Sequence, residues 1–521
     1  MKNYSNKLIS LALFIVFYSI NNSTNAQNRH YNAMTLGMGG GGVALIDGYH
    51  ANFLNPANLM IDNHEGSVYL NQLGFMGTGI SIDGSLLNIN VYNEYLTKGL
   101  TIEGQVQQDM LNSWFGTDDN DERAINISND IVPFGYSKRT FGATMSGKSV
   151  PFYKRAGFSV ATRIRNNQEF TINRGFANVF FSGLDSDKFS EPHPFDLNTK
   201  FLSYAEVSVG YATALPIPFK GIIKKLPLIN DIDIFVGVAP KYLIGIQSFE
   251  LDFASTLQVN SPFVRGNMII HDFDYKLYTY GEISDNLEEY AEKKSDGKQP
   301  LLADYTGYSG SDLGTLGSGF GLDLGVTLAM DVSLPILNVL DKNQQLRISL
   351  SLTDQGTISY NNNPMVFNGK GTFEFEPDIG DEDPADFFND LADSLQNDIY
   401  GNFTSESSVA RSYELPATLN LGAALIVGKL LVSGDISYGF NDISNNITEP
   451  IFTFGTQYRF FDFIPLRFGT RIGGGTSTAF STGLGIDLKN LEFSVGGLIV
   501  TDSSIGGAGL TGVLSGLILR F

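Results

Sequence analysis

The chain has 521 residues, of which 17% are charged, and it carries a formal net charge of −21 and no cysteine. An acidic chain without a basic stripe repels a phosphate backbone, which argues against nucleic acid as a partner. The absence of cysteine excludes disulfides, so the fold must close through its own hydrogen bonds. No run of eighteen apolar residues follows the N-terminus, which argues against a helical membrane protein.

The N-terminus has the pattern of a secretory signal. Lys2 and Lys7 precede an apolar run over 8–20, and small residues up to Ala26 suit a signal peptidase. We therefore predict a signal peptide over 1–26 that is cleaved after Ala26, which would take the net charge from −21 to −23. The run is too short for a spanning helix, and no cysteine follows it, so a lipoprotein anchor is excluded.

The stretch from Tyr413 to Phe521 alternates apolar residues with polar or very small ones. Strands of about ten residues with one apolar face, joined as sequential hairpins, are typical of an antiparallel transmembrane barrel. The alternation is cleanest over 419–427, 452–460, 466–472 and 480–488. Further strands are predicted upstream over 66–83, 132–147, 152–168, 200–214, 232–250, 316–331, 344–358 and 412–427. We therefore predict an all-β fold over 64–521, an antiparallel transmembrane β-barrel of about fourteen strands.

Turn lengths give this barrel an orientation. If the last strand ends in the periplasm, the tight turns near 428–429, 461–465 and 489–490 lie there too. Long inserts are then extracellular, over 84–131, 169–199, 251–315 and 359–411, and helices are predicted within them over 383–395, Glu103–Trp114 and Ser284–Lys294. The last strand ends on Phe521, which resembles the assembly signal read by the barrel-assembly machinery of bacterial outer membranes.

A glycine-rich stretch near the N-terminus carries a family resemblance. Gly37, Gly39 and Gly40 precede Asn55-Pro56-Ala57, which resembles the N-terminal segment of FadL-type long-chain fatty-acid transporters and of the PorV-type barrels of type IX secretion. Two later stretches, 413–422 and 431–435, are similar to hairpins of the same families. The resemblance implies an N-terminal hatch over 27–63 and a barrel of fourteen strands. Gly37, Gly39 and Gly42 also match a dinucleotide-binding pattern, but no strand precedes them.

Charged residues recur within the predicted strands. A charge that faces lipid at the bilayer midplane costs about 2–4 kcal/mol, so these side chains should face the lumen. One interpretation is that they pair across the lumen; the other is that Arg467 and Arg471, on one face of one strand, hold an anionic head group such as a carboxylate. The residues concerned are Arg163, Arg165, Glu206, Lys241, Asp323, Arg347, Asp435, Arg467, Arg471 and Asp487.

The remaining polar residues give no catalytic pattern. The carboxylates of Asp378–Asp383 could bind Ca²⁺, but they lack EF-hand spacing and are predicted to be a solvated acidic loop. The five histidines are scattered, without a zinc-binding motif, and no nucleophile motif is present. We therefore predict no enzyme activity, no metal and no cofactor.

Three functions fit this sequence in the bacterial outer membrane, where the barrel would contact outer-membrane lipid. The first is a FadL-like channel for hydrophobic or amphipathic small molecules, obstructed by the hatch. The second is a PorV-like structural barrel that docks a partner of a secretion or surface-assembly system and carries no ligand. The third, an open porin, conflicts with a hatch. An apolar pocket lined by residues of the hatch and of the extracellular loops would favour the first, and a sealed, charged lumen with an exposed apolar loop surface would favour the second.

Overall fold

The structure is a computed structural model. It describes residues 32–61, 64–71, 74–99, 101–140, 155–182, 187–216, 228–259, 269–307, 316–375, 401–441, 443, 446–474, 476–488, 490–501 and 507–521. The predicted signal peptide, the predicted helix over 383–395 and the Asp378–Asp383 cluster lie outside these residues.

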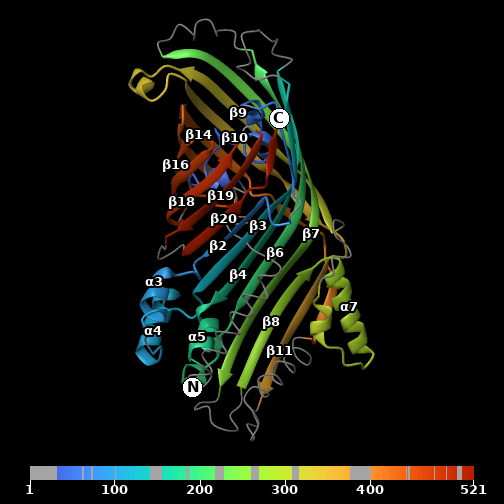
Figure 1. Cartoon of the computed structure of the whole chain (residues 1–521). Coiled ribbons are helices and arrows are strands. Elements are labelled where there is room, and N and C mark those ends of the chain that lie inside the picture. Colours follow the sequence, from blue (N-terminus) through green and yellow to red (C-terminus); the bar gives the residue numbers. More distant parts are fainter. Residues whose placement is uncertain are drawn as a thin grey trace.

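Fourteen antiparallel strands close into a barrel, as predicted (Figure 1). The first strand, formed by β1 and β2, pairs with β3 on one side and with β20 and β21 on the other, which closes the ring. In order around the barrel the strands are β1 (Gly66–Leu70) with β2 (Thr78–Gly84), β3 (Glu122–Arg139), β4 (Ala156–Asn173), β6 (Leu197–Leu215), β7 (Ile229–Val259), β9 (Gly317–Val332), β10 (Gln344–Tyr360), β13 (Arg411–Glu414) with β14 (Thr418–Val427), β15 (Leu430–Gly439), β16 (Ile451–Phe460), β17 (Ile464–Gly473), β18 (Thr476–Asp487), β19 (Leu491–Val500), and β20 (Ala508–Leu514) with β21 (Ile518–Arg520).

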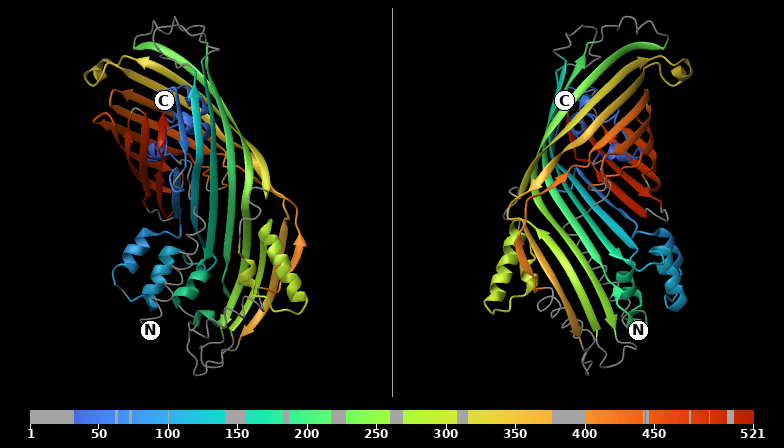
Figure 2. Two further views of the ribbon diagram at one scale, coloured as in Figure 1. Left: turned by 45° about the vertical axis from the view of Figure 1, so that its right-hand side comes forward. Right: turned by 180° about the vertical axis from the view of Figure 1, so that it is seen from behind.

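One side of the barrel is built from much longer strands than the other. β7 has 31 residues, whereas β15 has 10, and the excess length continues past the barrel as an open sheet (Figure 2). Four further strands complete this sheet, which we call the extension: β5 (His193–Pro194), β8 (Ile269–Thr279), β11 (Met365–Phe375) and β12 (Thr404–Ser407). The prediction of loops over 251–315 and 359–411 was therefore wrong in part. The strand signal was present in β8, where buried Phe273 and Tyr275 alternate with exposed Asp272 and Asp274.

Helices lie at the extension end and inside the barrel. The predicted helices near 103–114 and 284–294 are confirmed as α4 and α7, and α5 was not predicted. No helix in the described ranges combines the length and apolarity needed to cross a bilayer. The helices are α2 (Ala33–Leu36), α3 (Ile89–Val91), α4 (Gly104–Trp114), α5 (Arg174–Ser182) and α7 (Glu282–Ser295), with shorter turns η1 (Gly48–Phe53), η2 (Pro56–Met60), η3 (Tyr92–Leu96), η5 (Asp187–Ser190), η6 (Leu302–Tyr305) and η7 (Pro335–Val339).

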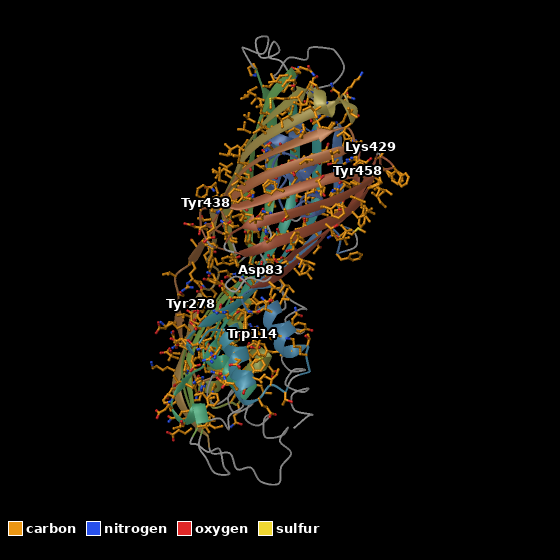
Figure 3. All side chains as sticks on the ribbon, turned by 90° about the vertical axis from the view of Figure 1, so that its left-hand side faces the viewer. Asp83, Trp114, Tyr278, Lys429, Tyr438 and Tyr458 are labelled. Carbon is orange, nitrogen blue, oxygen red and sulfur yellow. The ribbon has the colours of Figure 1, made fainter. Side chains whose placement is uncertain are left out.

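The outer surface of the barrel is apolar and bordered by aromatic residues. Leu421, Phe454 and Leu484 are about half exposed on the wall. Tyr438 lies near the extension end of the barrel, and Tyr458 lies at the opposite end, beside the tight turns (Figure 3). A transmembrane barrel has this arrangement, because aromatic rings settle at the two membrane–water interfaces and alkyl side chains settle between them. We call the end with the tight turns the turn end.

The described part of the predicted hatch, residues 32–61, lies inside the ring of strands (Figure 1). Gly39 has a φ of +94°, and a Cβ there would meet the Thr470 carbonyl of the wall at 2.6 Å, so only glycine fits. Its backbone N–H donates to Ser481 Oγ at 2.7 Å. The wall also leaves room for this segment, because a side chain at position Gly237 would collide with Pro56 and Ala57.

Two polar side chains hold this segment to the wall. The Asp435 carboxylate accepts hydrogen bonds from the Gly42 and Val43 N–H groups, each at 3.0 Å. Asn55 begins η2 by accepting from Ala57 N–H, and its amide donates to Thr327 Oγ1 at 2.9 Å. The predicted turn at Asn55-Pro56 is therefore present, and Asn55 itself is 0% exposed.

Phe521 lies at the seam where the sheet closes. Its carbonyl accepts from the Glu65 and Gly66 N–H groups at 3.0 and 3.1 Å, and its N–H donates to the Gly66 carbonyl. Its ring stacks on Tyr136, with 6.5 Å between ring centroids. Deletion of Phe521 would therefore remove seam hydrogen bonds, whereas its predicted role as an assembly signal stays a prediction.

Candidate functional site

A cluster of buried charges fills the lumen beside η1. We call it the lumen cluster; its members are Asp130, Arg163, Arg165, Glu206, Lys241, Asp323 and Asp354. Arg163 Nη2 lies 2.9 Å from Glu206 Oε2, and Arg165 Nη1 lies 3.0 Å from Asp354 Oδ2. Lys241 Nζ lies 2.5 Å from Asp354 Oδ1 and 2.8 Å from Asp323 Oδ2. The interpretation that these charges pair with one another is confirmed for the cluster, where Arg163 and Glu206 pair on neighbouring strands and Arg165 of β4 reaches Asp354 of β10.

The cluster and the hatch pack against each other inside the barrel. Arg163, Glu206 and Lys241 are only 0–2% exposed, so water does not reach them. The Phe53 ring of η1 lies under the Arg163 guanidinium, 4.6 Å from centroid to Cζ, and therefore covers the cluster on the hatch side.

Asp354 reaches the cluster through an irregularity in β10. Its φ is +56°, and the pairing of β10 with β9 shifts register between Leu352 and Gln355. Such a bulge re-aims a side chain that regular alternation would place elsewhere. Neither Asp354 nor Asp130 was among the predicted lumen charges; the interruption of the alternation by Asp354-Gln355-Gly356 was the available signal.

An apolar cavity of about 330 Å³ lies in the extension, and we call it the extension cavity. Strands β6, β7, β8 and β11 form its floor, and α5, α7 and η6 contribute its remaining walls. Eleven of the twelve lining residues are apolar or aromatic. They are Phe176, Phe195, Leu197, Leu251, Phe253, Tyr275, Leu277, Leu287, Leu302, Phe367 and Phe403, and the twelfth is Thr306.

Local sequence explains why α7 covers this cavity. Glu282 and Asp285 lie in its first turn and Lys293 and Lys294 in its last, which complements the helix dipole. Its buried face includes Leu287, which packs against Phe367 of β11. The sequence of α7 thus makes the helix amphipathic, and its apolar face forms one wall of the cavity.

A buried histidine lies behind the extension cavity. The His271 ring stacks on Phe253, which lines the cavity, with 6.2 Å between centroids, and meets the Phe195 ring edge-on at 6.3 Å. Burial lowers the pKa of His271 below its ordinary value, opposed in part by a hydrogen bond with the Thr256 backbone and by the neighbouring Asp272 carboxylate. The neutral imidazole is therefore the form that suits this aromatic stack.

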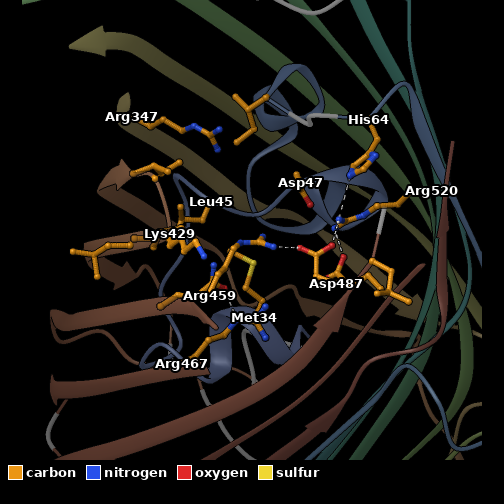
Figure 4. Close-up of a pocket in the computed structure, with 18 residues that line it drawn as sticks. Met34, Leu45, Asp47, His64, Arg347, Lys429, Arg459, Arg467, Asp487 and Arg520 are labelled. Carbon is orange, nitrogen blue, oxygen red and sulfur yellow. Dashed lines mark hydrogen bonds and ion pairs between the residues drawn. The ribbon is translucent and has the colours of Figure 1, made fainter. Parts of the chain in front are cut away.

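A second, polar cavity of about 350 Å³ lies at the turn end, between the hatch and the wall, and we call it the turn-end cavity (Figure 4). Arg467 lines it, whereas Arg471, four residues along the same strand, is not among the eighteen described residues around it. The structure therefore places the two predicted ligand-binding arginines in different surroundings. The predicted hatch residues Gly37, Gly39, Gly40, Asn55, Pro56 and Ala57 serve packing and turn geometry and line neither cavity.

The aromatic residues of the extension cavity were not predicted as a site. Their signal was weak, because they come from separate segments of the chain, and only the folded structure brings them together on one surface. Among the described residues, no group of three His, Asp or Glu side chains is arranged to hold a metal ion.

Comparisons with known proteins give a family and a set of distant likenesses. The toluene transporter TbuX of Ralstonia pickettii is 11% identical, with 96% of this chain and 99% of that chain covered and a TM-score of 0.40. The toluene transporter TodX of P. putida is 10% identical, with 95% and 99% covered and a TM-score of 0.40. The curated proteins give no match, and a model described as "Family of unknown function (DUF5723)" matches residues 56–497.

Proposed function

The chain belongs to this family of unknown function, and we propose that it is an outer-membrane barrel for the passive passage of hydrophobic or amphipathic small molecules. The observation that carries the proposal is the extension cavity. At about 330 Å³ it falls in the size range of small-molecule pockets, and its lining is almost entirely apolar, which suits a hydrophobic ligand. The even strand number, the apolar wall and the aromatic borders support the outer membrane as the location.

In this proposal the extension faces the outside of the cell and its cavity captures the solute. The hatch and the lumen cluster then hold the barrel closed between passages. Because a buried charge that loses its partner destabilises the fold by about 3–5 kcal/mol, passage would require the cluster and η1 to rearrange together, so that each charge keeps a partner.

One observation favours the alternative, a barrel that docks a secretion or surface-assembly partner without a small ligand. The lumen is filled by charges that are nearly inaccessible to water, with Glu206 and Asp323 both 0% exposed. A barrel of this kind would use the extension as a binding surface and would never open.

Ligand binding to the extension cavity separates the two functions. The refolded barrel in lipid nanodiscs is titrated with fluorobenzene and followed by ¹⁹F NMR, with empty nanodiscs as the baseline for partition into lipid. We expect saturable binding to wild type. Leu277→Asn should weaken it by about one to two orders of magnitude, because a buried amide left without a partner costs roughly 1–3 kcal/mol.

The matched control is Lys276→Asn, since Lys276 is the neighbouring residue of β8 and is exposed on the opposite face. It should bind as wild type does. Uptake of the same probe by cells that express wild type or Leu277→Asn then tests passage. Binding no better than to empty nanodiscs would reject the transport proposal and leave the docking barrel as the better account.

A further inference from the structure

The turn between β9 and β10, at the turn end of the barrel, folds back onto the outer wall. We call residues 333–343, which include η7, the outer turn. Thr327 of β9 reaches the hatch, so Met330 and Val332, which have the other parity in the same strand, face outward. These two side chains are nevertheless only 7% and 5% exposed, and Leu334 of the outer turn packs against the cluster that they form. The outer turn therefore covers part of the lipid-facing surface.

Gln344 holds the outer turn in this position. It lies opposite Val332 in the sheet and so also faces outward, yet it is buried. Its Oε1 accepts from Leu334 N–H at 2.8 Å, and its Nε2 donates to Asn338 Oδ1 and to the Asp341 carbonyl, each at 2.9 Å. These bonds reach both arms of the outer turn, so a buried amide with satisfied donors and acceptor fixes it to the wall.

The side of the outer turn that points away from the barrel is apolar. Ile336, Val339 and Leu340 are 88%, 91% and 60% exposed, and no other large apolar side chain in the described ranges is as exposed as the first two. In both views of Figure 2 the turn, drawn in yellow, projects sideways at the turn end. Apolar side chains that gather at one place on a surface mark contact with a membrane or a partner.

The surroundings favour lipid over a protein partner. Elsewhere at the turn end exposed aromatic rings, such as those of Tyr458 and Phe460, border the apolar wall. On β9 and β10 the apolar outward residues nearest that end are aliphatic, namely Met330, Val332 and Leu346. The outer turn thus lies where the aromatic border is interrupted, and it continues the apolar wall on the side that faces lipid.

We propose that the outer turn is an interfacial anchor, whose residues Ile336, Val339 and Leu340 insert into the periplasmic leaflet of the outer membrane. Amphipathic segments bury their apolar side chains about 5–10 Å into the boundary between headgroups and acyl chains. Lys342 is exposed at the end of the turn, which suits the lipid phosphates. The anchor fixes the depth of the barrel beside its longest strand, because β7 pairs with β9. The proposal rests on the membrane location and needs no ligand.

The single tryptophan of the chain, Trp114, makes a direct test possible. Trp114→Phe gives a tryptophan-free background, and Val339→Trp in it places one fluorescent reporter on the outer turn of the barrel refolded in phosphatidylcholine vesicles. We expect strong quenching by lipids brominated near the headgroup, weaker quenching by lipids brominated near the chain ends, and little quenching by acrylamide in the water. Ile336→Trp is the second reporter if Val339→Trp folds poorly, as checked by heat-modifiable mobility on gels.

Two reference variants in the same background calibrate the quenching. Phe454→Trp, in the middle of an outward-facing strand of the wall, should be quenched most by lipids brominated near the chain ends. Lys298→Trp, exposed in the extension, should be quenched mainly by acrylamide. Val339→Trp should respond differently from both, because the interface lies between the two environments.

A second measurement avoids tryptophan, which itself favours the membrane interface. Val339→Asn should raise the unfolding equilibrium constant of the barrel in vesicles about tenfold, because it removes an apolar side chain from lipid. The matched control is Lys342→Asn, exposed in the same turn, which should leave this constant unchanged. Urea titration followed by heat-modifiable mobility reports both constants.

Quenching of Val339→Trp by acrylamide as strong as that of Lys298→Trp, with none by either brominated lipid, would overturn the anchor and make the outer turn a surface for a periplasmic protein. Equal unfolding constants for Val339→Asn and Lys342→Asn would also overturn it. Fluorobenzene binding at the extension cavity is measured separately, so failure of the anchor leaves the proposed function standing, and failure of fluorobenzene binding leaves the anchor standing.

Discussion

The lumen cluster and the turn-end cavity both bury arginines, but they balance charge in opposite ways. In the lumen cluster three cations face four carboxylates, and the charges meet each other at 2.5–3.8 Å. In the turn-end cavity five cations face three carboxylates, and Arg467 has neutral partners. Arginine is therefore held by carboxylates in the lumen cluster, whereas Arg467 at the turn-end cavity is held by hydrogen bonds to neutral side chains.

Removal of one cation from the lumen cluster should have the largest effect on stability. Lys241→Met leaves Asp323 and Asp354 buried without the nearest cation of each, and breaking such a pair costs about 3–5 kcal/mol. We expect a lower urea midpoint for the refolded barrel, followed as the heat-modifiable fraction on gels. Lys138→Met, at an exposed position of β3, should change the unfolding free energy by no more than about 0.5 kcal/mol. Equal midpoints for the two variants would mean that the cluster does not hold the lumen closed.

A smaller effect is expected at Asp435, a buried acid whose partners are backbone N–H groups rather than cations. In Asp435→Asn the amide nitrogen is a donor and faces one of the two hatch N–H groups, which are also donors. Loss of this hydrogen bond should lower the free energy of unfolding by roughly 1–3 kcal/mol. Hydrogen exchange of the Gly42 and Val43 amides should become faster, while exchange in β15 stays slow. Asp462→Asn, at an exposed turn, is the control and should leave hatch exchange unchanged. Unchanged exchange in Asp435→Asn would show that this carboxylate does not anchor the hatch.

The smallest effect concerns His271, a buried base in the extension that packs among aromatic rings. Its folded pKa is lowered by burial, so the unfolded chain takes up the proton at a higher pH than the folded one. The extension is therefore expected to lose stability as the pH falls below the ordinary histidine value, about 6.5. Fluorobenzene affinity should decline modestly between pH 8 and pH 5 in wild type. A His271→Gln barrel should lack this decline. An equal decline in wild type and in His271→Gln would show that another group causes it.

The sequence by itself determined the barrel. Alternation with a period of two marks which face of each strand meets lipid, and it can be recognised one strand at a time, so fourteen strands and the inward direction of Arg163, Glu206 and Arg467 could be predicted. The resemblance of the glycine-rich stretch pointed to a segment inside the barrel. Strand ends were less certain, because β3 and β7 keep the same alternation where they leave the barrel for the extension.

Only the tertiary structure decided which charges neutralise each other and which do not. Arg165 and Asp354 are 189 residues apart in sequence and meet at 3.0 Å, partly because a bulge re-aims Asp354. Arg467 and Arg471 look equivalent in sequence, yet one lines a cavity beside the hatch and the other does not. The physical reason is that a strand's own pattern specifies the face on which a side chain lies, whereas its partners come from neighbouring strands and from the hatch, whose register no local pattern contains.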